Sequence, residues 1–454
     1  MKWIFTLFIF LIFNDLSGQY YTNQNKVWAF GLGTGLDFNS GRPVSITTSM
    51  NIGMGEPEGC ASVCDSSGHL LFYSNGMKVY NKTGAVMPTG SSIVSFNTIS
   101  TEQAALIIPV IGKSSQYYLF SLASVGQGNL AYSIVDMTLA GGLGDVIATT
   151  LGTPLQDTLG ENMIAITGNN NNIWLVTHKE DTPLFLAFNI TSSGISAPVV
   201  SEAGIFHGSQ CYAWSMLRES PDRRKIAQGV YESGQFYGTL LYDFDPNTGI
   251  VSNCKEIDTA NNNVYGIEFS PDNSKLYSTG NHCIIQYNIS LPTIAAIQAS
   301  KFVVTDSSLG ADLRLGPNGI IYFKGWRTND LHCISSPNLS GAACSYISHA
   351  VTMPSSSYET FPNLFVNTDT VNRVYINDLT FQTFITIYPN PTTTELTITS
   401  TNKISQITIA NPLGQPVYTH EYNTEKAAVN VSSLPTGIYF IKINSTEVRK
   451  FVKQ

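Results

Sequence analysis

Short runs of alternating hydrophobic and polar residues recur along most of this chain, and polar turn residues separate them. Residues Tyr265–Phe269 and Lys275–Ser278 are two such runs, with Pro271-Asp272-Asn273-Ser274 between them. Proline presets the backbone of the first central turn position, and aspartate and asparagine tolerate the tight conformations that follow. The pattern therefore predicts a β-hairpin at this place.

The same turn signal returns at a nearly constant interval. Its copies start at residues 65, 113, 169, 221, 271 and 317, so that successive copies are 46 to 56 residues apart. A period near fifty residues with four short strands in each unit is typical of a β-propeller. We therefore predict an all-β propeller with six complete units, which begin near residues 59, 103, 162, 211, 264 and 311.

Strand-like segments are left over at both ends of this repeat region. Residues 27–48 read as three strands of a unit that lacks its first strand, and Phe361–Val366 reads as a first strand without the other three. Joined, they would form a seventh blade and remove the two sheet edges that an open ring exposes. A seven-bladed propeller is therefore predicted, with six or eight blades as alternatives.

The regions outside the propeller have patterns of their own. Residues 1–18 contain a lysine followed by the apolar run Trp3–Phe13, which predicts a signal peptide. The propeller is expected over residues 19–370 and a polar linker over 371–384. Residues 385–454 alternate in short strands separated by Pro and Gly turns, which predicts a small Ig-like β-sandwich. No later segment is long and apolar enough to span a membrane.

Composition narrows the function classes. The formal net charge is −8, only 12% of residues are charged, and basic residues do not cluster, so no nucleic-acid partner is expected. Seven cysteines in an exported chain allow disulfides but leave at least one thiol free. Cys333 and Cys344 flank a predicted hairpin and are the best candidate pair, whereas the other cysteines read as small buried residues.

The last residues of the chain carry four ordered motifs. They are Tyr388-Pro389-Asn390-Pro391, then Gly414 followed by Gln415-Pro416, then Leu434–Ile443 with Gly437 and Tyr439, and finally a basic end that includes Lys450. Together these motifs resemble the type A sorting domain of the type IX secretion system of Bacteroidota. The resemblance implies passage through the periplasm to the outer-membrane surface or the medium. It also implies two partners, namely the secretion machinery and a surface peptidase that removes the domain.

The repeat region has a resemblance of its own, carried by Glu58-Gly59-Cys60-Ala61-Ser62 and by Leu313–Tyr322. These stretches are similar to propellers of the same phylum that precede such sorting domains. Some of those relatives are adhesin-like or gliding-motility surface proteins, and the group has no single activity. The resemblance implies a surface protein and no particular reaction.

Candidate chemistry lies at the centre of the predicted ring. The first strand of each blade lines the channel, so the residues just before these strands should converge on one face. Several residues at these positions carry carboxylates, which can hold a cation such as calcium, a cationic group or sugar hydroxyls. Alternatively, they cap loops and bind backbone amides. The predicted channel-mouth residues are Glu58, Glu102, Glu161, His207, Asn263, Asp312 and Glu359.

Two functions remain open from the sequence. The first is a binding or adhesion module at the cell surface with a glycan or protein ligand. The second is a secreted hydrolase or lyase that acts on a glycan or lactone through two of the carboxylates, with no pair singled out. The chain has no Gly-x-Ser-x-Gly, His-Glu-x-x-His or Gly-rich phosphate motif, so no catalytic residue and no metal-ligand motif is assigned. A structural spacer without any ligand is a third hypothesis.

Overall fold

The protein is described by a computed structural model that divides into two compact units, residues 1–375 and 376–454. The described residues are 22–50, 58–98, 101–124, 128–204, 216–230, 238–259, 264–280, 283–306, 312–324, 329–354, 360–368, 385–412, 414–444 and 447–454. The predicted signal peptide and linker lie outside them. We describe each unit by itself.

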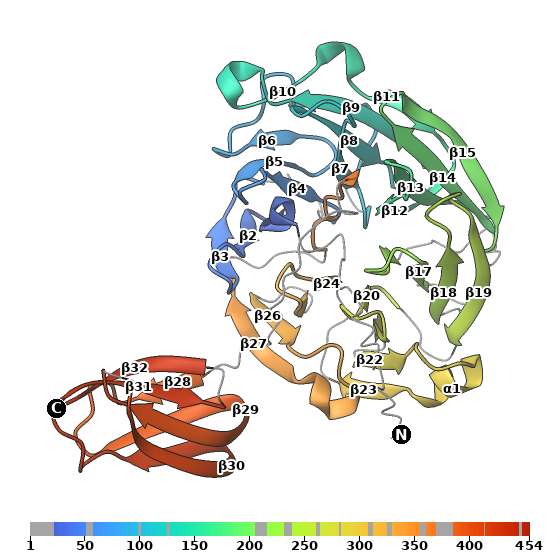
Figure 1. The fold of residues 1–454 in the computed structure, drawn as a ribbon. Coiled ribbons are helices and arrows are strands. Elements are labelled where there is room, and N and C mark those ends of the chain that lie inside the picture. Colours follow the sequence, from blue (N-terminus) through green and yellow to red (C-terminus); the bar gives the residue numbers. More distant parts are fainter. Residues whose placement is uncertain are drawn as a thin grey trace, which may run out of the picture. The chain divides into compact units, whose positions relative to one another are not determined.

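In the described part of the first unit, seven antiparallel sheets stand around a common centre (Figure 1). The predicted all-β propeller fold is thereby confirmed. The first three sheets are β1 (Val27–Phe30), β2 (Thr34–Asp37) and β3 (Val44–Thr47); β4 (Ala61–Cys64), β5 (Leu70–Ser74) and β6 (Val79–Asn81); and β7 (Ala105–Pro109), β8 (Gln116–Leu122), β9 (Leu130–Asp136), β10 (Asp145–Val146) and β11 (Thr153–Gln156).

The remaining four sheets have four strands each. They are β12 (Leu159–Thr167), β13 (Ile173–Lys179), β14 (Leu184–Thr191) and β15 (Gly194–Glu202); β16 (Leu217–Glu219), β17 (Lys225–Val230), β18 (Gly238–Phe244) and β19 (Val251–Asp258); β20 (Ile267–Phe269), β21 (Lys275–Gly280), β22 (Cys283–Asn288) and β23 (Phe302–Thr305); and β24 (Leu313–Leu315), β25 (Ile321–Lys324), β26 (Asp330–Ile334) and β27 (Tyr346–Thr352). One helix, α1 (Ile294–Ala299), precedes β23, and short 3₁₀ helices span Asn23–Asn25, Ala140–Gly142, Ala148–Thr150 and Gly341–Cys344.

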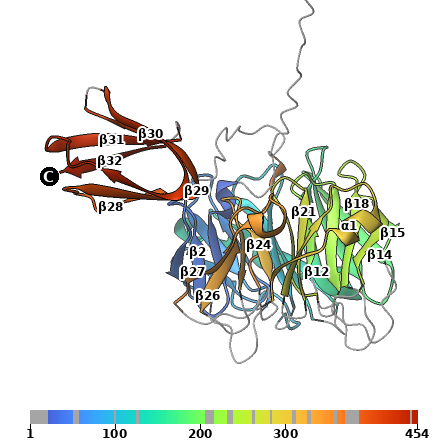
Figure 2. The same cartoon turned by 90° about the horizontal axis from the view of Figure 1, so that it is seen from below.

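Turn chemistry places the hairpins as the sequence predicts. Asn273 adopts a left-handed backbone conformation with φ of 63°, and its N–H donates to the Ser270 carbonyl at 3.0 Å. Phe269 of β20 then pairs with Leu276 of β21. Asparagine reaches this region of φ more readily than most residues because its short polar side chain bonds locally. Figure 2 shows the sheets of the first unit from the side.

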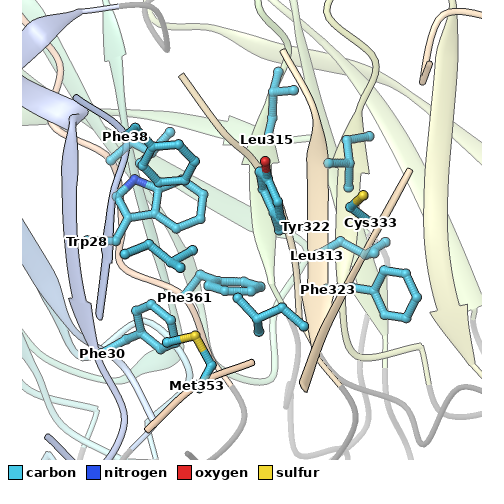
Figure 3. Packing of buried hydrophobic residues seen from close by; sticks show 14 of the residues in the cluster. Trp28, Phe30, Phe38, Leu313, Leu315, Tyr322, Phe323, Cys333, Met353 and Phe361 are labelled. Carbon is cyan, nitrogen blue, oxygen red and sulfur yellow. The ribbon is translucent and has the colours of Figure 1, made fainter. Parts of the chain in front are cut away.

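The ring closes through packing between its first and last sheets. Trp28 of β1 lies with its ring centroid 4.8 Å from Phe38 and 6.3 Å from Tyr322 of β25. Phe361 joins the same cluster, with its ring 5.4 Å from Trp28 and 5.2 Å from Phe30 (Figure 3). Burial of these large rings stabilises the junction of strands that are about 300 residues apart in the sequence.

The segment Phe361–Val366 differs from its prediction as the first strand of a closing blade. The sheet of β1–β3 has three strands, and the segment contributes a single parallel bridge, between Asn363 and Ala61 of β4. The reason is that its polar groups bond to several sheets instead of to β1. The Asn363 N–H donates to the Cys60 carbonyl at 2.9 Å, and its side-chain amide donates to the Ala105 carbonyl at 2.9 Å.

The second unit is an all-β domain with one five-stranded sheet. Two of its strands, β29 and β30, are longer than the short strands that the sequence predicts, and register shifts let each of them serve two parts of the domain. The first half of β29 pairs with β28 and the second half with β31. The strands are β28 (Ile385–Tyr388), β29 (Glu395–Ala410), β30 (Pro416–Asn430), β31 (Gly437–Ile443) and β32 (Glu447–Lys453).

Candidate functional site

Direct backbone contacts between the inner ends of successive sheets bring three glutamates together. The Gly59 N–H donates to the Thr101 carbonyl at 2.8 Å, and the Gln103 N–H donates to the Glu161 carbonyl at 3.2 Å. A Cβ at Gly59 would lie 1.9 Å from the Ala104 nitrogen, so only glycine permits this approach. Each contact lies at or beside a glutamate in the sequence.

The side chains of these glutamates form a compact carboxylate cluster. One carboxylate oxygen from each of Glu58, Glu102 and Glu161 lies within 4.8 Å of the other two. Glu102 and Glu161 are 4% and 2% exposed, whereas Glu58 is partly exposed. The Oε2 atom of Glu102 is buried and has no hydrogen-bond partner among the described residues. We call these three residues the glutamate cluster.

The electrostatics of the glutamate cluster disfavour three negative charges. Burial raises the pKa of Glu102 well above its usual range, and the Glu161 and Glu58 carboxylates raise this pKa further. Charges so close in a buried setting must be neutralised by protons or by a cation. In the described part of the chain, this cluster is the one group of acidic, histidine or cysteine side chains close enough to hold a metal ion.

Of the other predicted channel-mouth residues, the structure describes Asp312, which does not join the cluster. Asp312 accepts a hydrogen bond from the Arg218 Nη2 atom at 2.7 Å and from the Phe361 N–H at 2.9 Å. Because this arginine compensates its charge, Asp312 is part of the ion-pair network that holds the sheets together. His207, Asn263 and Glu359 lie outside the described residues.

Sequence reasoning missed that network of buried ion pairs. Glu268 lies 3.8 Å from Arg218 and 3.8 Å from Arg314, and it accepts a hydrogen bond from the Leu315 N–H at 2.9 Å. The signal was present, because a charged residue occupies the middle of three short first strands, β16, β20 and β24, whose first residues are apolar. A charge at such a position is buried and needs a partner.

The predicted disulfide between Cys333 and Cys344 is wrong, since both thiols are free and buried. Cys333 of β26 lies opposite Ile347 of β27, because the 3₁₀ helix Gly341–Cys344 takes up residues between the two strands. The Cys344 thiol interacts with the Tyr277 hydroxyl instead.

In the second unit, the structure brings the separate C-terminal motifs together. Asn390 accepts a hydrogen bond from the Val452 N–H at 2.9 Å and donates to the Lys450 carbonyl at 3.1 Å. Tyr439 stacks on Phe451 and donates its hydroxyl proton to the Pro435 carbonyl. The Tyr388 motif and the basic C-terminal end are therefore parts of one folded surface. Tyr388 itself is 46% exposed.

A comparison with known protein families finds a match for the second unit. Residues 386–454 match the family described as a secretion system C-terminal sorting domain. The protein is exported. The match indicates delivery to the cell surface or the medium and interaction with the secretion machinery, as the type IX motifs predict. None of the described helices is long and apolar enough to cross a membrane.

Similarity to solved structures is remote. The extracellular domain of a proposed one-component system from Bacteroides thetaiotaomicron aligns at 10% identity over 96% of this chain and 57% of its own, with a TM-score of 0.47. A periplasmic gluconolactonase from Pseudomonas aeruginosa aligns at 12% identity over 74% of this chain and 98% of its own, with a TM-score of 0.43. A proposed 6-phosphogluconolactonase from Bacteroides fragilis aligns at 12% identity over 79% of this chain and 92% of its own, with a TM-score of 0.37. No curated protein matches the chain.

Proposed function

We propose that this protein is an exported, seven-bladed propeller that acts as a binding module through the glutamate cluster. The observation that carries the proposal is the convergence of Glu58, Glu102 and Glu161 within 4.8 Å at the inner ends of three successive sheets. Concentrated negative charge attracts ligands with positive charge or hydroxyl groups. The partly exposed Glu58 gives such a ligand access to the cluster.

Delivery follows from the C-terminal unit. The secretion machinery recognises residues 386–454 on the folded protein. In this proposal a surface peptidase then removes that unit and leaves the propeller on the cell surface or in the medium.

The geometry favours binding over two-carboxylate hydrolysis. Retaining glycosidases separate their two carboxyl groups by about 5–5.5 Å and inverting ones by about 6.5–9.5 Å, so that a sugar or a water fits between them. The cluster oxygens are within 4.8 Å of one another, and two of the three glutamates are almost fully buried. With Glu102 and Glu161 buried, Glu58 alone offers a partly exposed carboxylate, whereas both mechanisms need two carboxyl groups beside the scissile bond.

One observation favours a hydrolase or lyase as the second candidate. The raised pKa of Glu102 is typical of a general acid that stays protonated near neutral pH. In that case Glu58, as the accessible carboxylate, would be the base or nucleophile.

A glycan array tests the proposed binding with the mature full chain, which starts after the predicted signal peptide. We expect binding of at least one glycan, and at least about tenfold weaker binding by Glu58→Gln and Glu161→Gln. Glu202→Gln is the matched control, because Glu202 is exposed at the end of β15. Equal binding by the cluster variants and the control would contradict the proposal. Products released from the bound glycan by the wild type alone would favour the hydrolase or lyase.

A further inference from the structure

We propose that Glu58, Glu102 and Glu161 bind one divalent cation with the coordination chemistry of calcium. The inference rests on the proposed function, because it places a cation at the same cluster. The cation would then contact the ligand. It assigns each glutamate one ligand oxygen.

The burial of Glu102 points to a missing positive charge. Its side chain is 4% exposed, and its Oε2 atom has no hydrogen-bond partner among the described residues. No arginine, lysine or histidine in that part of the chain forms an ion pair with it, and the groups that act on its carboxyl are mainly other carboxylates. A buried carboxylate without compensation costs several kcal/mol, so native structures supply a partner.

Other buried carboxylates of the same unit show what compensation looks like in this protein. Asp312 lies 2.7 Å from Arg218, and Glu268 lies between Arg218 and Arg314. These acids and the arginines are all almost fully buried. The chain therefore supplies arginine where a buried carboxylate serves only to hold sheets together, and Glu102 faces two further carboxylates instead.

The spacing of the cluster oxygens agrees with calcium. Calcium binds oxygens at about 2.3–2.6 Å, so two oxygens on one ion can be separated by up to about 4.6–5.2 Å. Magnesium binds at about 2.0–2.1 Å, which limits that separation to about 4.2 Å and requires near-octahedral geometry. The cluster oxygens lie within 4.8 Å of one another, and zinc would prefer nitrogen and sulfur ligands.

The frame around the cluster is rigid where the ligands attach. Backbone hydrogen bonds at Gly59 and at Gln103 join the three inner chain segments directly. The Thr360 hydroxyl donates to the Glu58 carbonyl and ties the segment of Glu58 to a further part of the chain. A preorganised set of oxygens binds a cation more strongly, because the chain loses little freedom on binding. The exposed side of Glu58 leaves coordination positions for water or for a hydroxyl of the ligand.

A shared proton is the competing arrangement. The carboxyl groups of Glu102 and Glu161 lie close together, and one of them can carry a shared proton when no cation is present. A cation would displace this proton and hold both carboxylates in the ionised form. The two arrangements therefore differ in whether calcium binds at all.

Calorimetric titration of the chelator-treated mature chain with calcium chloride tests the inference. We expect one site per chain and a thermal midpoint that rises by a few degrees with calcium. Magnesium chloride should bind more weakly. Glu102→Gln should lose at least about 100-fold in calcium affinity, and Glu202→Gln should bind as the wild type does. Without calcium, Glu102→Gln should melt at a higher temperature than the wild type, because its side-chain amide can donate a hydrogen bond to Glu161 without a shared proton.

The outcomes separate this inference from the proposed function. No binding heat and no shift up to about 10 mM calcium, roughly ten times the weakest extracellular calcium sites, overturns the inference. Retained calcium binding in both Glu102→Gln and Glu58→Gln also overturns it. If calcium fails while glycan binding still depends on Glu58 and Glu161, the proposed function stands alone. Should Glu102→Gln not fold by circular dichroism, the partly exposed Glu58→Gln decides.

Discussion

Buried carboxyl groups near the centre of the propeller differ in what faces them. Glu268 and Asp312 face arginines, whereas Glu102 faces the carboxylates of Glu58 and Glu161. In the first arrangement, ion pairs between opposite charges hold neighbouring sheets together. In the second arrangement, either a shared proton or a bound cation compensates the charge of Glu102, which is why we propose a function there.

Glu268 makes the stability of the propeller depend on pH. Burial raises its pKa from 4.5 to about 7, although Arg314 and Arg218 lower it in part and Glu219 raises it. A raised pKa means that the folded state holds the proton more tightly than the unfolded state. The stability that Glu268 contributes is therefore complete below pH 4.5 and is lost as the pH rises through about 7.

We expect Glu268→Gln to remove this dependence while keeping the acceptor for the Leu315 N–H. The difference in unfolding free energy, wild type minus variant, should fall by about 3 kcal/mol between pH 4.5 and 7.5. Urea denaturation of both proteins across this range measures it, and Glu202→Gln should show no such trend. A constant difference would mean that the two arginines fully offset the burial of Glu268.

At the scale of elements, the segment 360–368 acts as a connector between sheets. Asn363 bonds to Cys60 beside β4 and to Ala105 of β7, and it accepts a hydrogen bond from the Gln103 side chain at 2.8 Å. The Thr167 hydroxyl of β12 donates to the Asn367 carbonyl at 2.8 Å. One short segment thus joins three sheets through its hydrogen bonds. A regular strand would form these bonds with one adjacent strand.

Asn363→Ala should weaken this connection strongly. Asn363 is 5% exposed, and its loss leaves the Ala105 carbonyl without its side-chain donor and takes from the Gln103 amide the nearer of its two acceptors. We expect a fall of roughly 2–5 kcal/mol in the free energy of unfolding, measured by urea denaturation. Thr352→Ala removes an exposed hydrogen bond to Asp330 and should cost less than about 1 kcal/mol. A similar small cost for both variants would show that the segment does not hold the sheets together.

At the scale of the whole molecule, the two units have separate cores and separate tasks. The hydrophobic core of the second unit contains only residues of that unit, such as Leu396, Ile407 and Phe451. The first unit builds its own cores between neighbouring sheets. We therefore expect that export and the proposed ligand binding can be changed independently.

Deletion of residues 386–454 should stop export without unfolding the propeller. We expect the truncated protein in the periplasmic fraction and the full chain on the surface or in the medium, as measured by immunoblotting of cell fractions. Glu102→Gln in the full chain is the matched control and should be exported normally. Unchanged export of the truncated protein would contradict the role of the C-terminal unit.

Local chemistry in the sequence was enough to predict the fold class and the route of export. The turn residues, such as Asn273 and Gly68 with φ of 63° and 91°, act within a few residues of their own position and recur with a readable period. The sorting motifs are likewise short and contiguous. The sequence predicted Glu58, Glu102 and Glu161 just before the first strands of their units; in the structure Glu58 and Glu102 precede β4 and β7, and Glu161 lies within β12.

The tertiary structure alone decided which of the predicted channel-mouth residues meet. Asp312 does not join the glutamate cluster and pairs instead with Arg218, 94 residues away. Glu58 and Glu102 lie close together because the Gly59 N–H, just before β4, donates to the Thr101 carbonyl, just before β7 of the next sheet. The segment at Phe361 became a connector because its polar groups found partners on several sheets. Contacts between residues far apart in the sequence depend on the closed ring, and no local pattern encodes their distances.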